Sequence, residues 1–163
     1  FIGNLNYLPN FLACKDFIKQ IMPKLNLKLP DIKFCIIGNI SKINKMLLPK
    51  NINVEILGQK KSLSPYIKNT FCGLANLKIA TGVQGKVLTY MSYGLPVVCS
   101  TRVSNNFGSN VLSYKSSSEL VEKIILLKQD ITKSKILSKK SLKYSRNLNW
   151  KSVSLKYLKL INF

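Results

Sequence analysis

Residues 79–100, IATGVQGKVLTYMSYGLPVVCS, contain the residue types and spacing that could do chemistry. The segment reads as the end of an apolar strand, a turn bracketed by glycines, a helix, and a second apolar strand. This order places Gly82, Gly85 and Lys86 at a helix N-terminus, where backbone N–H groups and the helix dipole attract an anion. Glycine lets the anion approach closely, and the lysine supplies a counter-charge. The segment therefore predicts a phosphate site.

The spacing differs from that of the phosphate loop of nucleoside triphosphatases. That loop needs a glycine and a hydroxyl residue where this chain has Ala80 and Val87. No acidic residue lies between Lys60 and Glu119 to hold magnesium. These differences argue against a triphosphatase. They leave open a turn that binds diphosphate without a metal, and a turn that the glycines merely shape, with Lys86 solvated.

Length and composition predict one globular domain. The chain has 163 residues, 46% of them hydrophobic, which is enough to bury a core. No run approaches the ~20 apolar residues that cross a bilayer, and no signal peptide is visible. Because Phe1 already lies in an apolar, strand-like run, we expect the chain to be the C-terminal part of a longer protein.

The cysteines and basic residues narrow the functions that this chain could have. Four widely spaced cysteines and the lack of histidine indicate small buried side chains in a reducing compartment, with a zinc site or disulfide framework disfavoured. The net charge of +20 could attract nucleic acid, but only Arg102 and Arg146 are arginines, the residue suited to bidentate phosphate contacts. We interpret the lysines as a solvated surface, and an anionic lipid surface stays open as a partner.

Apolar periodicity predicts alternating strands and helices. We expect strands at 1–3, 32–37, 53–57, 77–80 and 96–100, and helices at 10–22 and 83–93 that end at Pro23 and Gly94. A capping box at Ser116 and Glu119 begins a helical region. The tail 132–163 predicts two or three helices, with Trp150 as a core anchor.

This alternation predicts a Rossmann-like α/β fold. We expect a doubly wound, mostly parallel sheet with helices on both faces and a helical C-terminal tail. Residues 1–115 would form the core, and residues 116–163 would pack on it within one domain overall.

Three glycine-containing loops follow predicted strand ends, at residues 3–7, 38–39 and 81–85. In such folds ligands bind at the carboxyl ends of the strands, so we expect these loops to converge on one crevice. The first loop does not fit the dinucleotide pattern, because Leu5 and Leu8 replace its later glycines. A nicotinamide or flavin enzyme is therefore disfavoured.

Several segments together carry a resemblance. In chain order, FIGNLNYLPN, FCIIG, VEILG and GVQGKVLTYMSYGLPVVCS resemble the C-terminal domain of GT-B glycosyltransferases of family 4, over residues 1 to about 115. The resemblance implies the nucleotide-sugar-binding half of a two-domain enzyme, whose acceptor-binding half would precede Phe1. Such enzymes typically work without a bound metal, so we expect no cofactor and no metal.

The resemblance also implies a donor site, although it assigns no catalytic residue. The residues at matching positions are Gly3, Asn4, Thr81, Gly82, Val83, Gln84, Gly85, Lys86 and Thr89, with Gly58 and Tyr66 as candidate base contacts. Lys86 would stabilise the leaving nucleoside diphosphate. Thr81 and Thr89 stand where many members carry glutamates, the second of which binds ribose. A neutral hydrogen bond is weaker than a charge-assisted one, so donor affinity, stereochemistry and activity stay open.

The implied function is transfer of a sugar from a nucleotide diphosphate sugar to a cell-surface glycan or lipid-linked acceptor, by a cytoplasmic or peripheral membrane protein. We expect this segment alone to turn over little, because both halves are needed to exclude water and orient the acceptor. Two alternatives are a basic Rossmann-like domain that binds nucleic acid and, given Thr81 and Thr89, a catalytically silent interaction module.

Overall fold

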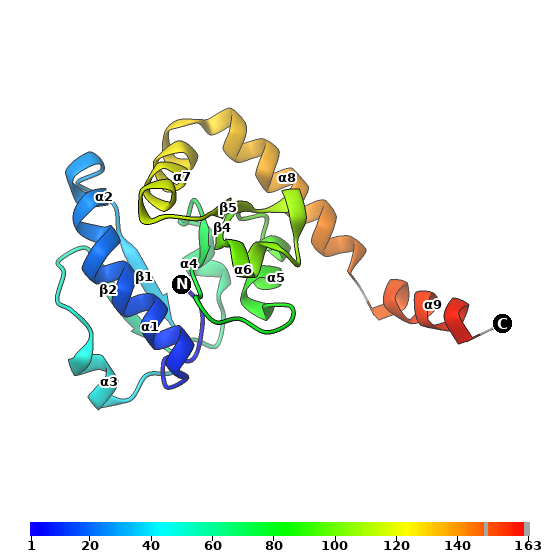
Figure 1. The fold of residues 1–163 in the computed structure, drawn as a ribbon, viewed down its shortest axis with the longest axis horizontal. Helices are drawn as coiled ribbons and strands as arrows, with labels where there is room; N and C mark the ends of the chain where they lie inside the picture. Colours follow the sequence, from blue (N-terminus) through cyan, green and yellow to red (C-terminus); the bar gives the residue numbers. More distant parts are fainter. Residues whose placement is uncertain (149, 162–163) are drawn as a thin grey trace.

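Short parallel strands form the centre of the fold, and helices lie around them (Figure 1). The computed structural model describes residues 1–148 and 150–161, without the side chains of 150–153, 156 and 157. The strands are β1 (Phe34–Ile37), β2 (Val54–Gly58), β3 (Gly73–Ala75), β4 (Val97–Ser100) and β5 (Leu112–Tyr114). The helices are α1 (Leu8–Asp16), the π-helix η1 (Phe17–Ile21), α2 (Met22–Lys28), α3 (Lys42–Leu47), α4 (Ser64–Ile67), α5 (Gly85–Ser92), α6 (Thr101–Ser104), the 3-10 helix η2 (Gly108–Asn110), α7 (Ser117–Gln129), α8 (Ile131–Asn147) and α9 (Trp150–Ile161).

The strands pair in two groups. β1 pairs with β2, and β4 lies between β3 and β5, with every pairing parallel. The chain start joins the first group, because Ile2 forms a parallel bridge with Ile37. These pairings confirm the predicted Rossmann-like, parallel architecture.

A tyrosine side chain lies between the two groups of strands. The Tyr90 hydroxyl accepts a hydrogen bond from the Ile2 N–H at 2.7 Å and donates one to the Leu74 carbonyl at 3.2 Å. A Cβ atom at position 73 would collide with the Tyr90 ring, so Gly73 makes room for it. The phenol therefore links strands that do not pair there directly.

Helices cover both sides of the strands. On one side η1 and α2 contact α7, which packs on β4 and β5, and on the other side α5 packs on β3 and β4 and contacts α8. The core between them consists of side chains such as Leu5, Ile36, Val87, Val98 and Leu120, all almost fully buried. Strands with apolar residues on both faces require this double cover.

The first helix differs from its predicted boundaries. It begins at Leu8 and continues through η1 into α2 as far as Lys28, so the prediction that Pro23 ends it is wrong. Pro23 lies in the first turn of α2, directly after the π-helical turn. Proline has no N–H to donate to the preceding turn, and the helix here is π-helical at that turn instead of regularly α-helical.

Two strand predictions also need correction. The strand predicted at 77–80 is wrong, since β3 lies four residues earlier and the segment after it is irregular, with Ile79 exposed. β3 starts at a glycine, which strand propensity disfavours, and its sequence therefore gave little signal. β5 was not predicted, because its three residues are too few to show alternation.

The helical region after Ser116 follows the prediction. The Ser116 hydroxyl accepts the Glu119 N–H at 3.2 Å, and the Glu119 carboxylate accepts the Lys115 N–H at 2.7 Å, which begins α7. The predicted tail helices are α8 and α9, and α9 extends away from the strands (Figure 1). The predicted core role of Trp150 concerns a side chain outside the described residues. Within residues 1–148 and 150–161, no helix is both long and apolar enough to span a bilayer.

Candidate functional site

The loops that follow the bridge at Ile2, strand β1 and strand β2 meet at one corner of the fold. The Leu5 N–H donates to the Asn39 carbonyl at 2.7 Å, and the Gly38 N–H donates to the Gly58 carbonyl at 3.0 Å. A Cβ atom on Gly38 would collide with the Gly3 carbonyl oxygen, and its φ of 148° also favours glycine. Glycine at this position therefore lets the loops at Gly3 and Gly58 pack closely.

The turn before α5 joins the same corner through side chains. The Lys86 Nζ donates to the Asn10 Oδ1 at 2.6 Å, and the Asn10 Nδ2 donates to the Asn4 carbonyl at 2.9 Å. Asn10 is only 8% exposed and lies on α1. This relay connects the start of α5 to the Asn4 loop, which the Leu5–Asn39 hydrogen bond connects to the loop after β1.

Lys86 has an unusual environment for a lysine. Its side chain is half-buried, and its ammonium lies 3.8 Å from the centroid of the Phe1 ring, within cation–π range. Burial lowers the pKa of the Lys86 ammonium to about 8. An ammonium has three N–H donors, and the hydrogen bond to Asn10 uses one. A bound anion would therefore both accept further hydrogen bonds and restore the charged form.

The first turn of α5 has no side-chain cap. The Gln84 side chain at the N-cap donates instead to the Thr81 carbonyl at 3.1 Å. Gly82, with φ of +62°, reverses the chain, and Asn106 donates to its carbonyl at 3.0 Å. Backbone N–H groups at the start of α5 are thus not occupied by a capping side chain and can bind an anion.

The remaining predicted residues of this turn carry no charge. Thr81 and Val83 are exposed, and Thr89 is half-buried. The Thr89 hydroxyl donates to the Gly85 carbonyl at 3.0 Å, one turn back on α5, which leaves its lone pairs as acceptors. Of the predicted residues 81–86 and 89, Lys86 is the one whose side chain can carry a charge.

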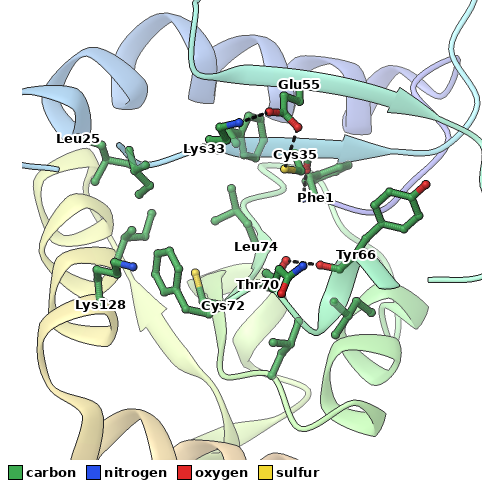
Figure 2. Close-up of a pocket in the computed structure, with 18 of the residues that line it drawn as sticks. Phe1, Leu25, Lys33, Cys35, Glu55, Tyr66, Thr70, Cys72, Leu74 and Lys128 are labelled. Atoms are coloured by element: carbon green, nitrogen blue, oxygen red, sulfur yellow. Dashed lines mark hydrogen bonds and ion pairs between the residues drawn. The ribbon is translucent and has the colours of Figure 1, made fainter. Parts of the chain in front are cut away.

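The two candidate base contacts lie in different surroundings. Gly58 ends β2 beside Gly38, and a side chain there would meet open space. Tyr66, on α4, lines a cavity between β1 and β3 (Figure 2). The Lys60 ammonium lies 5.3 Å from the centroid of its ring. The structure therefore places Gly58 at the corner where the loops at Gly3, Gly38 and Gly58 meet, which we call the glycine corner, and places Tyr66 at the cavity between β1 and β3.

Asn10 is the site residue that sequence reasoning did not single out. It orients Lys86 and holds the first loop with the same amide group, and Gly3 has no side chain that would displace it. The available signal was an asparagine directly after Pro9, at the start of a helix that follows a glycine loop. The structure buries Asn10, and most buried side-chain amides make hydrogen bonds, as this one does.

Acidic groups lie away from this corner. Asp16 pairs with Lys78 and Glu55 with Lys33, both at 2.6 Å, and Glu119 belongs to the helix cap. In the part of the chain that the structure describes, no group of histidine, cysteine and acidic side chains could hold a metal ion. The arrangement can bind an anion by backbone N–H groups and one lysine.

Comparisons with known proteins identify the family and the fold. The family model described as "Glycosyl transferases group 1" matches residues 1–130. Among solved structures, TarM has a TM-score of 0.79 at 19% identity over 100% of this chain and 34% of its own. HepE from Anabaena, in complex with UDP, has a TM-score of 0.74 at 12% identity over 98% of this chain and 47% of its own.

A third solved structure extends the pattern. A glycosyltransferase from Rickettsia africae has a TM-score of 0.72 at 11% identity, over 98% of this chain and 45% of its own. The chain therefore spans less than half the length of these three structures, with which it shares its fold. A search of curated proteins found no match to the chain.

Proposed function

Because the chain belongs to the group 1 glycosyltransferases, we propose that it binds the nucleotide diphosphate sugar for a glycosyl transfer reaction. The observation that carries the proposal is the contact of Lys86 with Asn10, 2.6 Å long, which brings an uncapped helix N-terminus and a lysine beside the Asn4 loop. A diphosphate needs both backbone donors and a counter-charge. This corner offers both from residues that are already positioned.

The proposed site works on the leaving group. The N–H groups at the start of α5 and the Lys86 ammonium bind the two phosphates, with Gly3, Asn4 and the 81–86 turn around them. As the bond between sugar and phosphate breaks, negative charge grows on the nucleoside diphosphate, and these donors stabilise it. Burial strengthens this effect, since a half-buried charge is less screened by water.

Nucleoside recognition is proposed at the neighbouring strand ends. Thr89 accepts a hydrogen bond from the ribose, and Gly58 lies where a base can approach the backbone without a side chain in the way. Tyr66 is a base contact only if it turns from the cavity that it lines. HepE was solved with UDP, which makes UDP the first nucleotide to test.

The acceptor half of the reaction is proposed to lie outside these residues. The acceptor is a cell-surface glycan or a lipid-linked sugar, presented at the cytoplasmic face of a membrane. The net charge of +20 supports attraction to anionic headgroups near such an acceptor. We expect the 163-residue chain to bind donor without appreciable transfer, because water is not excluded from an open site.

The decisive experiment is thermal unfolding with UDP, GDP and ADP, and with their sugars, on the wild type and on Lys86→Met. We expect one nucleotide to raise the Tm of the wild type, and the variant to bind it about 10- to 100-fold more weakly, since a charge-assisted hydrogen bond is lost. Lys139→Met removes an exposed lysine from α8 and should bind like the wild type.

The unliganded variant supplies a further control. Burial disfavours the charged form of Lys86, whereas loss of its hydrogen bond leaves the buried Asn10 Oδ1 without this partner, so the two effects of Lys86→Met on the Tm at pH 7 oppose each other. Each shift in Tm caused by nucleotide is therefore measured from the Tm of the same protein without nucleotide. If no nucleotide stabilises the wild type, the donor-site proposal fails. If the variant binds as tightly as the wild type, the role given to Lys86 fails.

A further inference from the structure

Helix α3 turns an apolar face to solvent. Ile43, Met46 and Leu47 have the three- and four-residue spacing of one helix face, and they are 71%, 84% and 55% exposed. The loop that follows α3 adds Ile52, which is 96% exposed. Large apolar side chains that gather on a surface mark a place where another surface binds. The outer face of α3 therefore indicates an interaction surface.

Lysines accompany these apolar side chains. Lys42 and Lys45 are exposed on α3, and Lys50 is exposed in the loop that follows the helix. The sequence has no acidic residue within 32–54, so no carboxylate from this segment balances their charge. The surface is therefore both apolar and positively charged.

Polar side chains fix α3 to a loop of the glycine corner. The Ser41 N–H donates to the Asn6 Oδ1 at 2.8 Å, and the Asn44 Nδ2 donates to the Leu5 carbonyl at 3.0 Å. Leu48, directly after α3, is buried. Helix α3 lies at the edge of the fold, apart from β3, β4 and β5 (Figure 1). The contacts with the protein body thus occupy the inner side of α3 and leave its apolar side chains in water.

We propose that the α3 surface, made of Ile43, Met46, Leu47 and the three lysines of residues 42–50, docks on an anionic lipid bilayer. The apolar side chains enter the boundary between headgroups and acyl chains, and the lysine ammonium groups stay among the headgroups. Nucleic acid would use the lysines alone and leave the apolar side chains in water. A protein partner fits less well, because lysine is depleted from the cores of protein interfaces.

This surface deepens the proposed function and rests on it for the link to an acceptor. A lipid-linked acceptor lies in a bilayer, and α3 is held against residues 5–6, in the loop that is proposed to line the donor site. Docking through α3 therefore brings the glycine corner close to the membrane surface. The glycosyl donor and a membrane-bound acceptor are then concentrated at the same place.

Co-sedimentation with lipid vesicles tests the apolar part of the surface. The vesicles are phosphatidylcholine with about one-third phosphatidylglycerol. Ile43→Ser combined with Met46→Ser leaves the net charge unchanged and should weaken vesicle binding at least about tenfold, because the bilayer buries less apolar area. Ile131→Ser combined with Ile136→Ser removes exposed apolar side chains from α8 and should bind within about twofold of the wild type.

Two triple variants of equal charge separate the α3 surface from the net charge. In one, the three lysines of residues 42–50 become glutamine; in the other, Lys135, Lys139 and Lys140 on α8 become glutamine. The α3 variant should lose at least about tenfold more vesicle affinity than the α8 variant, since only its lysines lie at the headgroups. Vesicles of phosphatidylcholine alone should bind the wild type at least about tenfold more weakly.

Several results would overturn the proposal. It is wrong if the Ile43→Ser, Met46→Ser variant binds vesicles like the wild type, if the α8 variants lose as much affinity as their α3 counterparts, or if vesicles without anionic lipid bind equally well. A dimer that this double variant dissociates, with vesicle binding unchanged, would assign the α3 surface to a second copy of the chain. Light scattering detects such a dimer.

Thermal unfolding with nucleotide separates this proposal from the donor site. The α3 variants change exposed side chains, so the shift in Tm caused by nucleotide should equal that of the wild type. If no nucleotide stabilises the wild type while vesicle binding still depends on α3, the donor-site proposal fails and the membrane surface stands. If nucleotide binds and vesicle binding does not depend on α3, only the membrane surface is wrong.

Discussion

Two side chains of α5, one turn apart, tie that helix to the start of the chain in different ways. Lys86 is half-buried and reaches Asn10 at the glycine corner, whereas Tyr90 is 2% exposed and bridges Ile2 and Leu74 in the interior. The Lys86 ammonium is partly accessible and can bind an anionic ligand in place of Asn10. The Tyr90 hydroxyl is buried between two backbone groups, so its role is structural.

Burial acts on both groups and separates their chemistry. It lowers the pKa of the Lys86 ammonium to about 8, and it raises the pKa of the Tyr90 hydroxyl far above its ordinary value. Lys86 therefore changes charge near physiological pH, while Tyr90 stays neutral and keeps its proton for the Leu74 carbonyl. Helix α5 thus has a side chain that can change its charge at the N-terminus, Lys86, and one that stays neutral a turn later, Tyr90.

The largest expected effect comes from filling the space that Gly73 leaves for the Tyr90 ring. Gly73→Ala places a Cβ atom against the Tyr90 ring and should lower the free energy of unfolding by about 3 kcal/mol, measured by urea denaturation. The double variant Gly73→Ala with Tyr90→Ala removes the collision, so the two losses should not add. Additive losses would mean that Gly73 does not act through the ring.

Loss of the hydroxyl alone should cost less. Tyr90→Phe leaves the Ile2 N–H and the Leu74 carbonyl without their partner, and the free energy of unfolding should fall by about 1–3 kcal/mol. Nucleotide affinity should stay within about twofold of the wild type, because the glycine corner is unchanged. A large loss of affinity with unchanged stability would reverse the roles of the two side chains.

A smaller effect is expected from the residue between them. Thr89→Glu introduces a carboxylate that can accept a hydrogen bond from ribose, and nucleotide affinity should rise about threefold to tenfold. Thr89→Val removes the hydroxyl and should lower affinity by a few-fold at most. Calorimetric titration of both variants checks this, and unchanged affinity in both would place the ribose elsewhere.

The sequence predicted the fold class and the helix-start residues well, because both depend on local patterns. The turn at Gly82 and Gly85, the helix after it and the cap at Ser116 are set by neighbouring residues. The role of Asn10 depends on a contact 76 positions away along the chain, and the cavity at Cys35 depends on how strands pair. Such long-range placements leave no periodic signal.

The same distinction explains the errors. A proline usually ends a helix. Here Pro23 lies in the first turn of α2, directly after the π-helical turn η1, and helix propensity does not reveal such a turn. The strand at Gly73 is held by pairing with β4 and by the Tyr90 ring, not by its own residues. Tertiary contacts overrode local preference at both places.

The most direct test of the account is the pH dependence of nucleoside diphosphate binding, with Lys86→Arg as the matched variant. An anion holds Lys86 protonated, so above a free pKa of about 8 the Kd of the wild type should rise by up to about tenfold per pH unit. Lys86→Arg keeps its charge throughout this range, and its Kd should stay nearly constant between pH 7 and pH 9.5. A flat profile for the wild type, or an equal slope for both proteins, would contradict the assignment of Lys86 to the diphosphate.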